Sequence, residues 1–195
     1  MYDWAAYIDV DEFIAVNSKE SLKDMLDQWK LVPQLSLNWR LIGDNGLHDD
    51  GTSNSVIQRF TMGAKSLNKH VKQLVNFKFI RESGMNLPLF VNPHCTNAAS
   101  VTVAGDKILG PFNTSKLDEQ QPLELYHYAT KTREELHAKV MRGRADTTHG
   151  RQDEEESYFK EHNINEVPCL AVKSIWELAK PKRVECARTL TEVYY

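Results

Sequence analysis

Cysteine is scarce in this sequence, which has three cysteines among 195 residues. Cys95, Cys169 and Cys186 are an odd number at wide spacings and include no CxxC pair, so they indicate neither a disulfide framework nor a zinc site. Reduced thiols are typical of proteins in a reducing compartment. We therefore expect a cytoplasmic protein.

Long apolar runs and a strong net charge are also missing. No stretch approaches the roughly 20 apolar residues of a membrane-spanning helix, and the opening MYDWAAYIDVDEF has no basic region followed by an apolar one. We therefore expect no integral membrane segment and no secretion signal. The 24 basic and 27 acidic residues are mixed along the chain, which leaves a formal charge of -3. Without a basic stripe, nucleic acid is not an expected partner.

What is present suits one ordinary globular domain, since 41% of the residues are hydrophobic and 26% are charged. Two capping-box spacings predict helix starts, the first at Asn17 and Glu20 and the second at Thr132 and Glu135. A further helical and more charged pattern begins near residue 153 and continues to the end of the chain. The first two predicted helices cover residues 16–30 and 131–143.

Strand patterns fill the middle of the chain, where branched and aromatic residues recur between glycine and proline. These predicted strands cover residues 35–43, 55–63, 72–80, 87–91, 98–105 and 123–129. A long polar loop at residues 43–54 is a candidate binding loop or lid. The fold class is therefore α/β or α+β, with helices at the end of the chain.

The most unusual stretch is YIDVDEFI, residues 7–14, which places three carboxylates between apolar residues. If it is the end of a buried strand, Asp9 and Asp11 project to one face while Val10 points into the protein. Two adjacent carboxylates repel each other unless something compensates their charge. The alternatives are a bound divalent cation, one shared proton, or nearby lysines and arginines.

Basic and imidazole groups farther along the chain are the candidate partners of this acidic stretch. His127 ends a predicted strand and Lys131 precedes a predicted helix, so they could provide a metal ligand and a phosphate contact, or a core histidine and a solvated lysine. His94, in the turn NPHC, and Lys72 could meet a phosphate or be ordinary turn and strand residues. Arg142 could also contact a ligand, or only complement the dipole of the preceding helix.

Several motifs together resemble a known family in order and spacing. DWAAYIDVDEFI, LNWRLIGDNG, VIQRFT, HVKQLV, VNPHC, GPFNT, HYATKTREELHAKVMRGRAD and YFKEHNINEV are similar to segments of bacterial family-2-like and family-92 glycosyltransferases of the GT-A fold. The resemblance covers about residues 3 to 167. It implies a GT-A-like α/β fold with a mixed sheet flanked by helices. Residues 1–150 would form the C-terminal part of that domain, without its N-terminal nucleotide-binding half, and residues 151–195 a helical extension packed on it.

The resemblance also implies an activity, which is metal-dependent transfer of a sugar from a nucleotide-diphosphate sugar, such as a UDP-sugar, to a glycan or other hydroxyl acceptor. Mn²⁺ or Mg²⁺ would bind the donor diphosphate. The implied metal ligands are Asp9, Asp11 and His127, and the implied donor contacts are Lys131, Lys72, His94 and Arg142. A sheet edge left open by the absent half would favour self-association.

Inversion at the sugar carbon would require a carboxylate that takes the proton of the acceptor hydroxyl. Asp44, in the loop IGDNG, and Glu12 are the candidates. A regular strand would point Glu12 away from Asp11 and so favour Asp44, whereas a bend would reverse this. Trp39, beside the same loop, is a candidate platform for the acceptor sugar, while Trp4 and Trp29 are predicted to be core residues.

Two other functions remain open at this point. A phosphohydrolase of the haloacid dehalogenase type would use Asp9 as its nucleophile, although the spacing from the acidic strand to GDNGLHDD is too short for its usual later motifs. A sugar-binding or interaction protein without catalysis is the alternative outside the enzymes.

Overall fold

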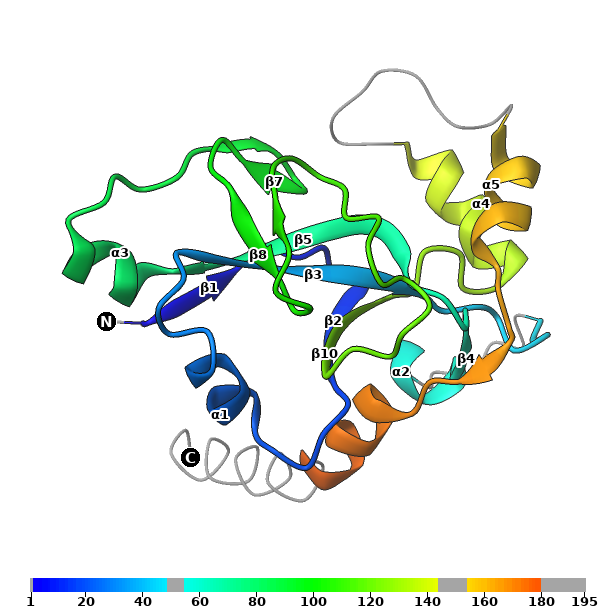
Figure 1. Cartoon of the computed structure of the whole chain (residues 1–195). Coiled ribbons are helices and arrows are strands. Elements are labelled where there is room, and N and C mark those ends of the chain that lie inside the picture. Colours follow the sequence, from blue (N-terminus) through cyan, green and yellow to red (C-terminus); the bar gives the residue numbers. More distant parts are fainter. Residues whose placement is uncertain (1, 49–54, 144–153, 180–195) are drawn as a thin grey trace, which may run out of the picture.

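The computed structural model describes residues 2–48, 55–143 and 154–179 and shows a mixed α/β fold (Figure 1). Part of the predicted loop at 43–54, Cys186 and the helical pattern predicted for residues 180–195 lie outside the described residues. Among the helices of the described ranges, none combines the length and apolar character needed to cross a membrane.

A mixed seven-stranded sheet forms the centre of the molecule. Its main path runs β1, β5, β3, β10, β2, so that β1 and β2 lie at the two ends of the path. β3 is parallel to β10 and to β8, and the other pairs in this sheet are antiparallel. The strands are β1 (Trp4–Ala6), β2 (Glu12–Val16), β3 (Gln34–Leu41), β5 (Asn68–Asn76), β8 (Ser100–Thr102), β9 (Lys107–Ile108) and β10 (Leu123–His127).

Two smaller sheets and a set of helices surround this centre. The small sheets pair β4 (Met62–Gly63) with β11 (Val167–Pro168), and β6 (Phe90–Asn92) with β7 (Cys95–Thr96). The helices are α1 (Leu22–Asp27), α2 (Val56–Arg59), α3 (Phe77–Ser83), α4 (Arg133–Arg142), α5 (Glu155–His162) and a further helical segment at residues 171–179. In Figure 1, α4 and α5 lie side by side, and they pack together through Leu136, Val140 and Phe159.

Every residue of β3 is buried, because both of its faces are covered. Alternate residues form an apolar face, which packs against Met25 and Leu26 of α1 and against Leu123 and Leu125 of β10. The opposite face is polar but hydrogen-bonded, as burial of polar groups requires. The apolar residues are Leu35, Leu37, Trp39 and Leu41, and the polar ones are Gln34, Ser36, Asn38 and Arg40.

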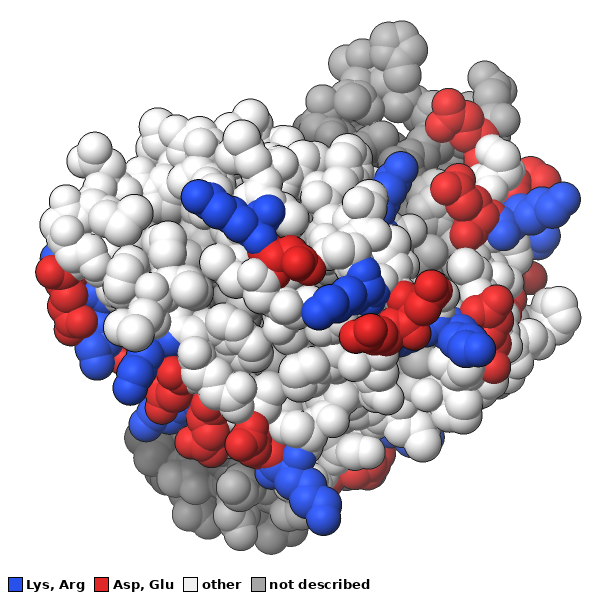
Figure 2. Space-filling model, viewed as in Figure 1, with Lys and Arg blue, Asp and Glu red and all other residues white. Residues whose placement is uncertain are grey.

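On the face of the molecule seen in Figure 2, Lys and Arg side chains lie next to Asp and Glu side chains in several groups, and wide areas of uncharged residues lie between these groups.

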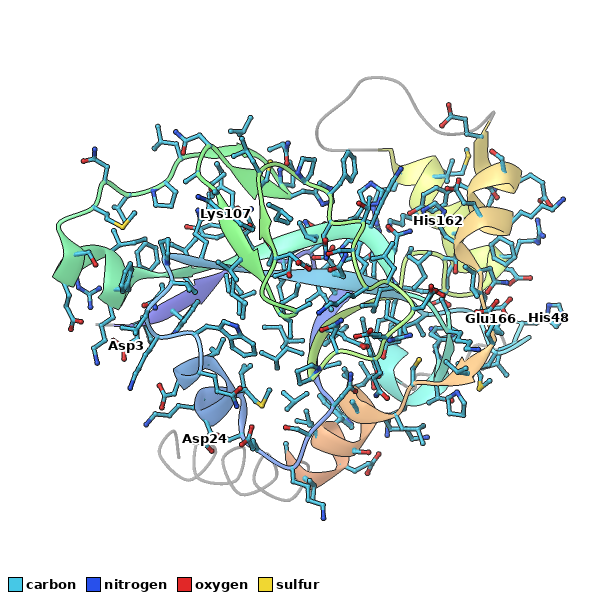
Figure 3. All side chains as sticks on the ribbon, in the orientation of Figure 1. Asp3, Asp24, His48, Lys107, His162 and Glu166 are labelled. Carbon is cyan, nitrogen blue, oxygen red and sulfur yellow. The ribbon has the colours of Figure 1, made fainter. Side chains whose placement is uncertain are left out.

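Some polar contacts connect distant segments of the chain. Glu166, labelled in Figure 3, accepts a hydrogen bond of 2.8 Å from the backbone N–H of Lys65, which ties the segment before β11 to the segment after β4.

The sequence predicted the central strands and one helix correctly. The predicted strands at 35–43 and 123–129 correspond to β3 and β10, and α4 begins with the predicted capping box of Thr132 and Glu135. The first helix is shorter than predicted, and its N-cap is Ser21, which accepts from the N–H of Asp24, so the capping box at Asn17 was wrong.

Two strand predictions were wrong in part, where local contacts favour a helix. Residues 55–63 form α2 followed by β4, because Ile57 and Phe60 have the three-residue spacing that buries one side of a helical turn. The strand predicted at 72–80 ends at Asn76, whose side chain accepts from the N–H of Phe79 and caps α3.

The polar face of β3 contains a buried ion pair between Arg40 and Glu124 of β10, with nitrogen–oxygen distances of 2.6 Å. Glu124→Ala should lower the free energy of unfolding by about 3–5 kcal/mol, because it leaves the buried guanidinium unpaired. Urea unfolding measures this. Glu119→Ala, at an exposed position, is the control and should change stability by less than about 0.5 kcal/mol. Equal losses in both variants would contradict a structural role for the pair.

Candidate functional site

The acidic stretch does not form one continuous strand. Asp9, Val10 and Asp11 lie in the turn between β1 and β2, and the N–H of Glu12 donates to the carbonyl of Asp9 (3.0 Å). Val10 is 99% exposed at the tip, so the prediction that it points into the protein was wrong. Two further hydrogen bonds stabilise the turn. The N–H of Asp9 donates to the Glu12 carboxylate (2.8 Å), and the N–H of Tyr128 donates to the carbonyl of Asp11 (2.9 Å).

Strand pairing brings His127 to this turn. β2 is antiparallel to β10 with Glu12 opposite His127, and β10 is parallel to β3 with His127 opposite Leu41. The turn therefore lies at the carboxyl ends of the two parallel strands, the edge where ligands bind in α/β sheets. Nε2 of the buried His127 is 3.9 Å from Oδ1 of Asp11.

Lys72 compensates the charge of Asp9. Its side chain, on β5, is 1% exposed, and its ammonium lies 3.0 Å from Oδ2 of Asp9 and 3.6 Å from Oε2 of Glu12. One buried cation is thus shared between two carboxylates. In this structure Lys72 contacts the acidic turn itself, so a role at a donor phosphate would require the carboxylates to give up part of this contact.

Lys139 compensates the charge of Asp11 and was not among the residues predicted from the sequence. Its ammonium donates to Oδ2 of Asp11 (2.7 Å) and lies 3.4 Å from the carbonyl of Ala129. Lys139 lies on α4, 128 positions after Asp11 in the chain. The sequence signal was limited to its place on the helix that follows His127 and Lys131.

Burial and these lysines set the ionisation of the site. Burial raises the pKa of Glu12 to about 7, against the backbone N–H of Asp9 and the charge of Lys72, which lower it. Burial alone would raise the pKa of Asp11, but the hydrogen bond and charge of Lys139 hold this pKa below its ordinary value. Burial lowers the pKa of His127, so its imidazole is neutral near pH 7.

His127 packs in a cluster of aromatic and imidazole rings around Trp39. The Trp39 ring lies 4.2 Å from the His127 ring, 4.8 Å from His70 and 5.1 Å from His94, measured between centroids. Trp39 is only 7% exposed and belongs to the core, so it is not the open acceptor platform that the sequence predicted. Trp4 and Trp29, predicted to be core residues, pack against the same core.

The other predicted donor contacts differ in position. His94 is half-buried, and its Nδ1 lies 3.3 Å from the carbonyl of Val71, the residue before Lys72. Lys131 precedes α4 with a positive φ of 57°, and its charge contributes to the low pKa of Asp11. Arg142 is exposed in the last turn of the 10-residue helix α4, where it complements the helix dipole.

The two predicted catalytic bases have structural partners. Glu12 is fully buried and contacts the N–H of Asp9 and Lys72, while its Oε1 has no hydrogen-bond partner within the described ranges. Oδ1 of Asp44 accepts from the N–H of Gly46 (2.8 Å) and from the side chain of Asn165 (3.0 Å). These contacts connect the loop that contains Asp44 to the segment that contains Asn165.

A groove of about 370 Å³ opens beside the turn. Asp9, with its side chain 58% exposed, and the ammonium-bearing Lys72 are on its wall. Asn92 and several apolar groups complete the lining, and the rings of Tyr7 and Phe90 lie 4.3 Å apart. The apolar members include Tyr7, Ile8, Phe90 and Pro93.

The residues fit a divalent cation in part. Oδ1 of Asp11 and Nε2 of His127 are 3.9 Å apart, a separation that two ligands at roughly 2.1 Å from one ion can adopt. Within the described parts of the chain, no group of three or more His, Cys, Asp or Glu side chains is arranged to hold a metal. The site therefore offers two protein donors, and Lys139 and Lys72 occupy neighbouring carboxylate oxygens.

Comparisons with known proteins add no family assignment: no protein-family model matches the chain, and a search of curated proteins found no similar sequence.

The pKa of Glu12 generates a prediction about stability. Because its folded-state pKa is above the ordinary value of 4.5, its contribution to stability is complete below pH 4.5 and is lost as the pH rises through about 7. Glu12→Gln is neutral throughout. Its stability relative to the natural chain should therefore rise between these pH values by up to about 3 kcal/mol. Urea unfolding across pH 4–8 measures the difference, and a difference independent of pH would contradict the prediction.

Proposed function

We propose that this protein is a glycosyltransferase of the GT-A type, which transfers a sugar from a nucleotide-diphosphate donor to a hydroxyl acceptor. The observation that carries the proposal is that the turn of Asp9, Val10 and Asp11 lies beside His127 and three lysines at the carboxyl ends of β3 and β10. The lysines are Lys72, Lys131 and Lys139. Carboxylates, a neutral imidazole and ammonium groups in one place suit a diphosphate bound together with a divalent cation.

Asp11 and His127 would hold the cation, and Asp9, two positions away on the same turn, is the second carboxyl group of that turn. A bound Mn²⁺ or Mg²⁺ would neutralise the diphosphate leaving group. Burial keeps the His127 imidazole unprotonated, which is the form that binds metals. The Trp39 ring packs against the His127 ring, with the two centroids 4.2 Å apart and the ring planes tilted by 52°.

The lysines would bind the negative charge of the diphosphate. Lys131 is half-buried directly before α4, and Lys139 is on the same helix, with its ammonium already beside Asp11. Both groups approach from the α4 side of the turn. Lys72 approaches from β5, on the groove side. A diphosphate placed between them would be neutralised from two directions, as the departure of a charged nucleotide requires.

The groove beside Asp9 would receive the acceptor. Tyr7 and Phe90 offer ring surfaces of the kind that sugars pack against, and Asp9 is the exposed carboxylate there. Glu12 is buried behind Lys72 and would position Lys72 and Asp9 without touching the acceptor. Among the described residues β1 pairs only with β5. Self-association through this end of the sheet remains a prediction, which light scattering tests.

The proposed function predicts that UDP binding depends on Mn²⁺. Calorimetric titration of the natural chain with UDP should show binding when Mn²⁺ is present and a loss of at least about tenfold in affinity without it. Asp11→Asn should abolish the effect of Mn²⁺, because it removes the buried anionic ligand. Thermal unfolding confirms that this variant is folded.

Asp27→Asn is the matched control, since Asp27 is an exposed aspartate on α1, and it should bind UDP as the natural chain does. Binding that is indifferent to Mn²⁺ and to the Asp11 substitution would contradict the proposed site.

A further inference from the structure

The two aspartates of the turn are compensated by lysines of very different burial, and this difference carries an inference that rests on the proposed function. Lys72 is 1% exposed and has two carboxylate partners, Asp9 and Glu12. If Asp9 turned towards a ligand, Glu12 would still lie 3.6 Å from the ammonium. Lys72 is therefore a fixed part of the site.

Lys139 is the more exposed partner. Its side chain is 39% exposed, and its only carboxylate partner in the described part of the chain is Asp11. The backbone of α4 is held independently, by the Thr132–Glu135 capping box at its start and by packing of Leu136 and Val140 on α5. The long side chain of Lys139 can therefore leave Asp11 by bond rotation while the helix stays in place.

The Lys139 ammonium and a divalent cation compete for the same carboxylate. Oδ2 of Asp11 accepts from Lys139 at 2.7 Å, while Oδ1 faces His127 at 3.9 Å. A divalent ion bound between Asp11 and His127 would have an ammonium group within a few ångströms. Two like charges at such a distance, in a partly buried site, repel strongly. The cation binds well only if the ammonium moves away or gains an anion of its own.

A diphosphate supplies that anion. We propose that Lys139 occupies the cation site of the free protein and transfers from Asp11 to the donor diphosphate when the cation binds. Lys139 is thus a positioning residue that couples the two ligands. Without diphosphate, the lysine opposes the cation. Without the cation, Asp9 and Asp11 oppose the diphosphate. Each ligand therefore increases the affinity for the other, as linkage requires.

The experiment measures Mn²⁺ binding directly, from the electron paramagnetic resonance signal of free Mn²⁺, with inorganic pyrophosphate as the diphosphate probe. For the natural chain, saturating pyrophosphate should increase the affinity for Mn²⁺ by at least about tenfold. Lys139→Met should bind Mn²⁺ without pyrophosphate at least about tenfold more tightly than the natural chain, because Asp11 is free. In this variant the effect of pyrophosphate on Mn²⁺ affinity should be much smaller.

Two further variants make the result specific. Lys139→Gln removes the charge with a polar side chain, and should behave as Lys139→Met does even if the apolar variant folds poorly. Lys160→Met removes an exposed lysine from the neighbouring helix α5 and should leave Mn²⁺ binding unchanged. Thermal unfolding checks that each variant is folded.

Equal Mn²⁺ affinity of the natural chain and both Lys139 variants, measured without pyrophosphate, would overturn the inference. If the natural chain still bound UDP only with Mn²⁺, the proposed function would survive that result. Tighter Mn²⁺ binding by the variants with no diphosphate binding by any chain would overturn the transfer of Lys139 to diphosphate and the proposed function together. Absence of Mn²⁺ binding in every folded chain would overturn both as well.

Discussion

The parallel pairing of β10 with β3 is the constraint on which the rest of the structure depends. It places Glu124 next to Arg40 on the polar face of β3, and it aligns the end of β10 with the end of β3. β2 then pairs with the free side of β10, so the turn before β2 must lie beside His127. Two parallel strands thus determine both the buried ion pair and the position of the candidate site.

Charge compensation is the second constraint, because the acidic turn is only partly exposed to water. Asp11 and Glu12 are buried, and buried carboxylates need positive or hydrogen-bonding partners. Lys72 and Lys139 meet this need from two different elements, β5 and α4. The turn therefore acts as a junction that holds the first strands of the chain to a helix more than 120 residues later. In the proposed function, a diphosphate and a cation would have to displace contacts that stabilise the free protein.

Comparison of the predicted and observed structure at individual positions shows where a local sequence pattern is enough to predict the structure. Thr132 and Glu135 predicted the start of α4 because both partners of a capping box lie within one turn of helix. The pattern failed at residues 55–63, where branched residues indicated a strand but the burial of Ile57 and Phe60 favoured a helical turn. It also failed at Val10, because the direction of that side chain depends on a turn that is fixed by Tyr128, far away in the chain.

The sequence by itself determined the chemistry of the site: the carboxylates Asp9, Asp11 and Glu12 and the basic groups His127, Lys131 and Lys72 are visible as residue types in motifs. It also determined the central strands, since β3 and β10 have strong strand patterns. Only the tertiary structure decided which group compensates which carboxylate, that Lys139 belongs to the site, and that Trp39 is buried. The physical reason is that these contacts join residues far apart in the chain, and their distances depend on strand pairing and helix packing, which a local pattern does not contain.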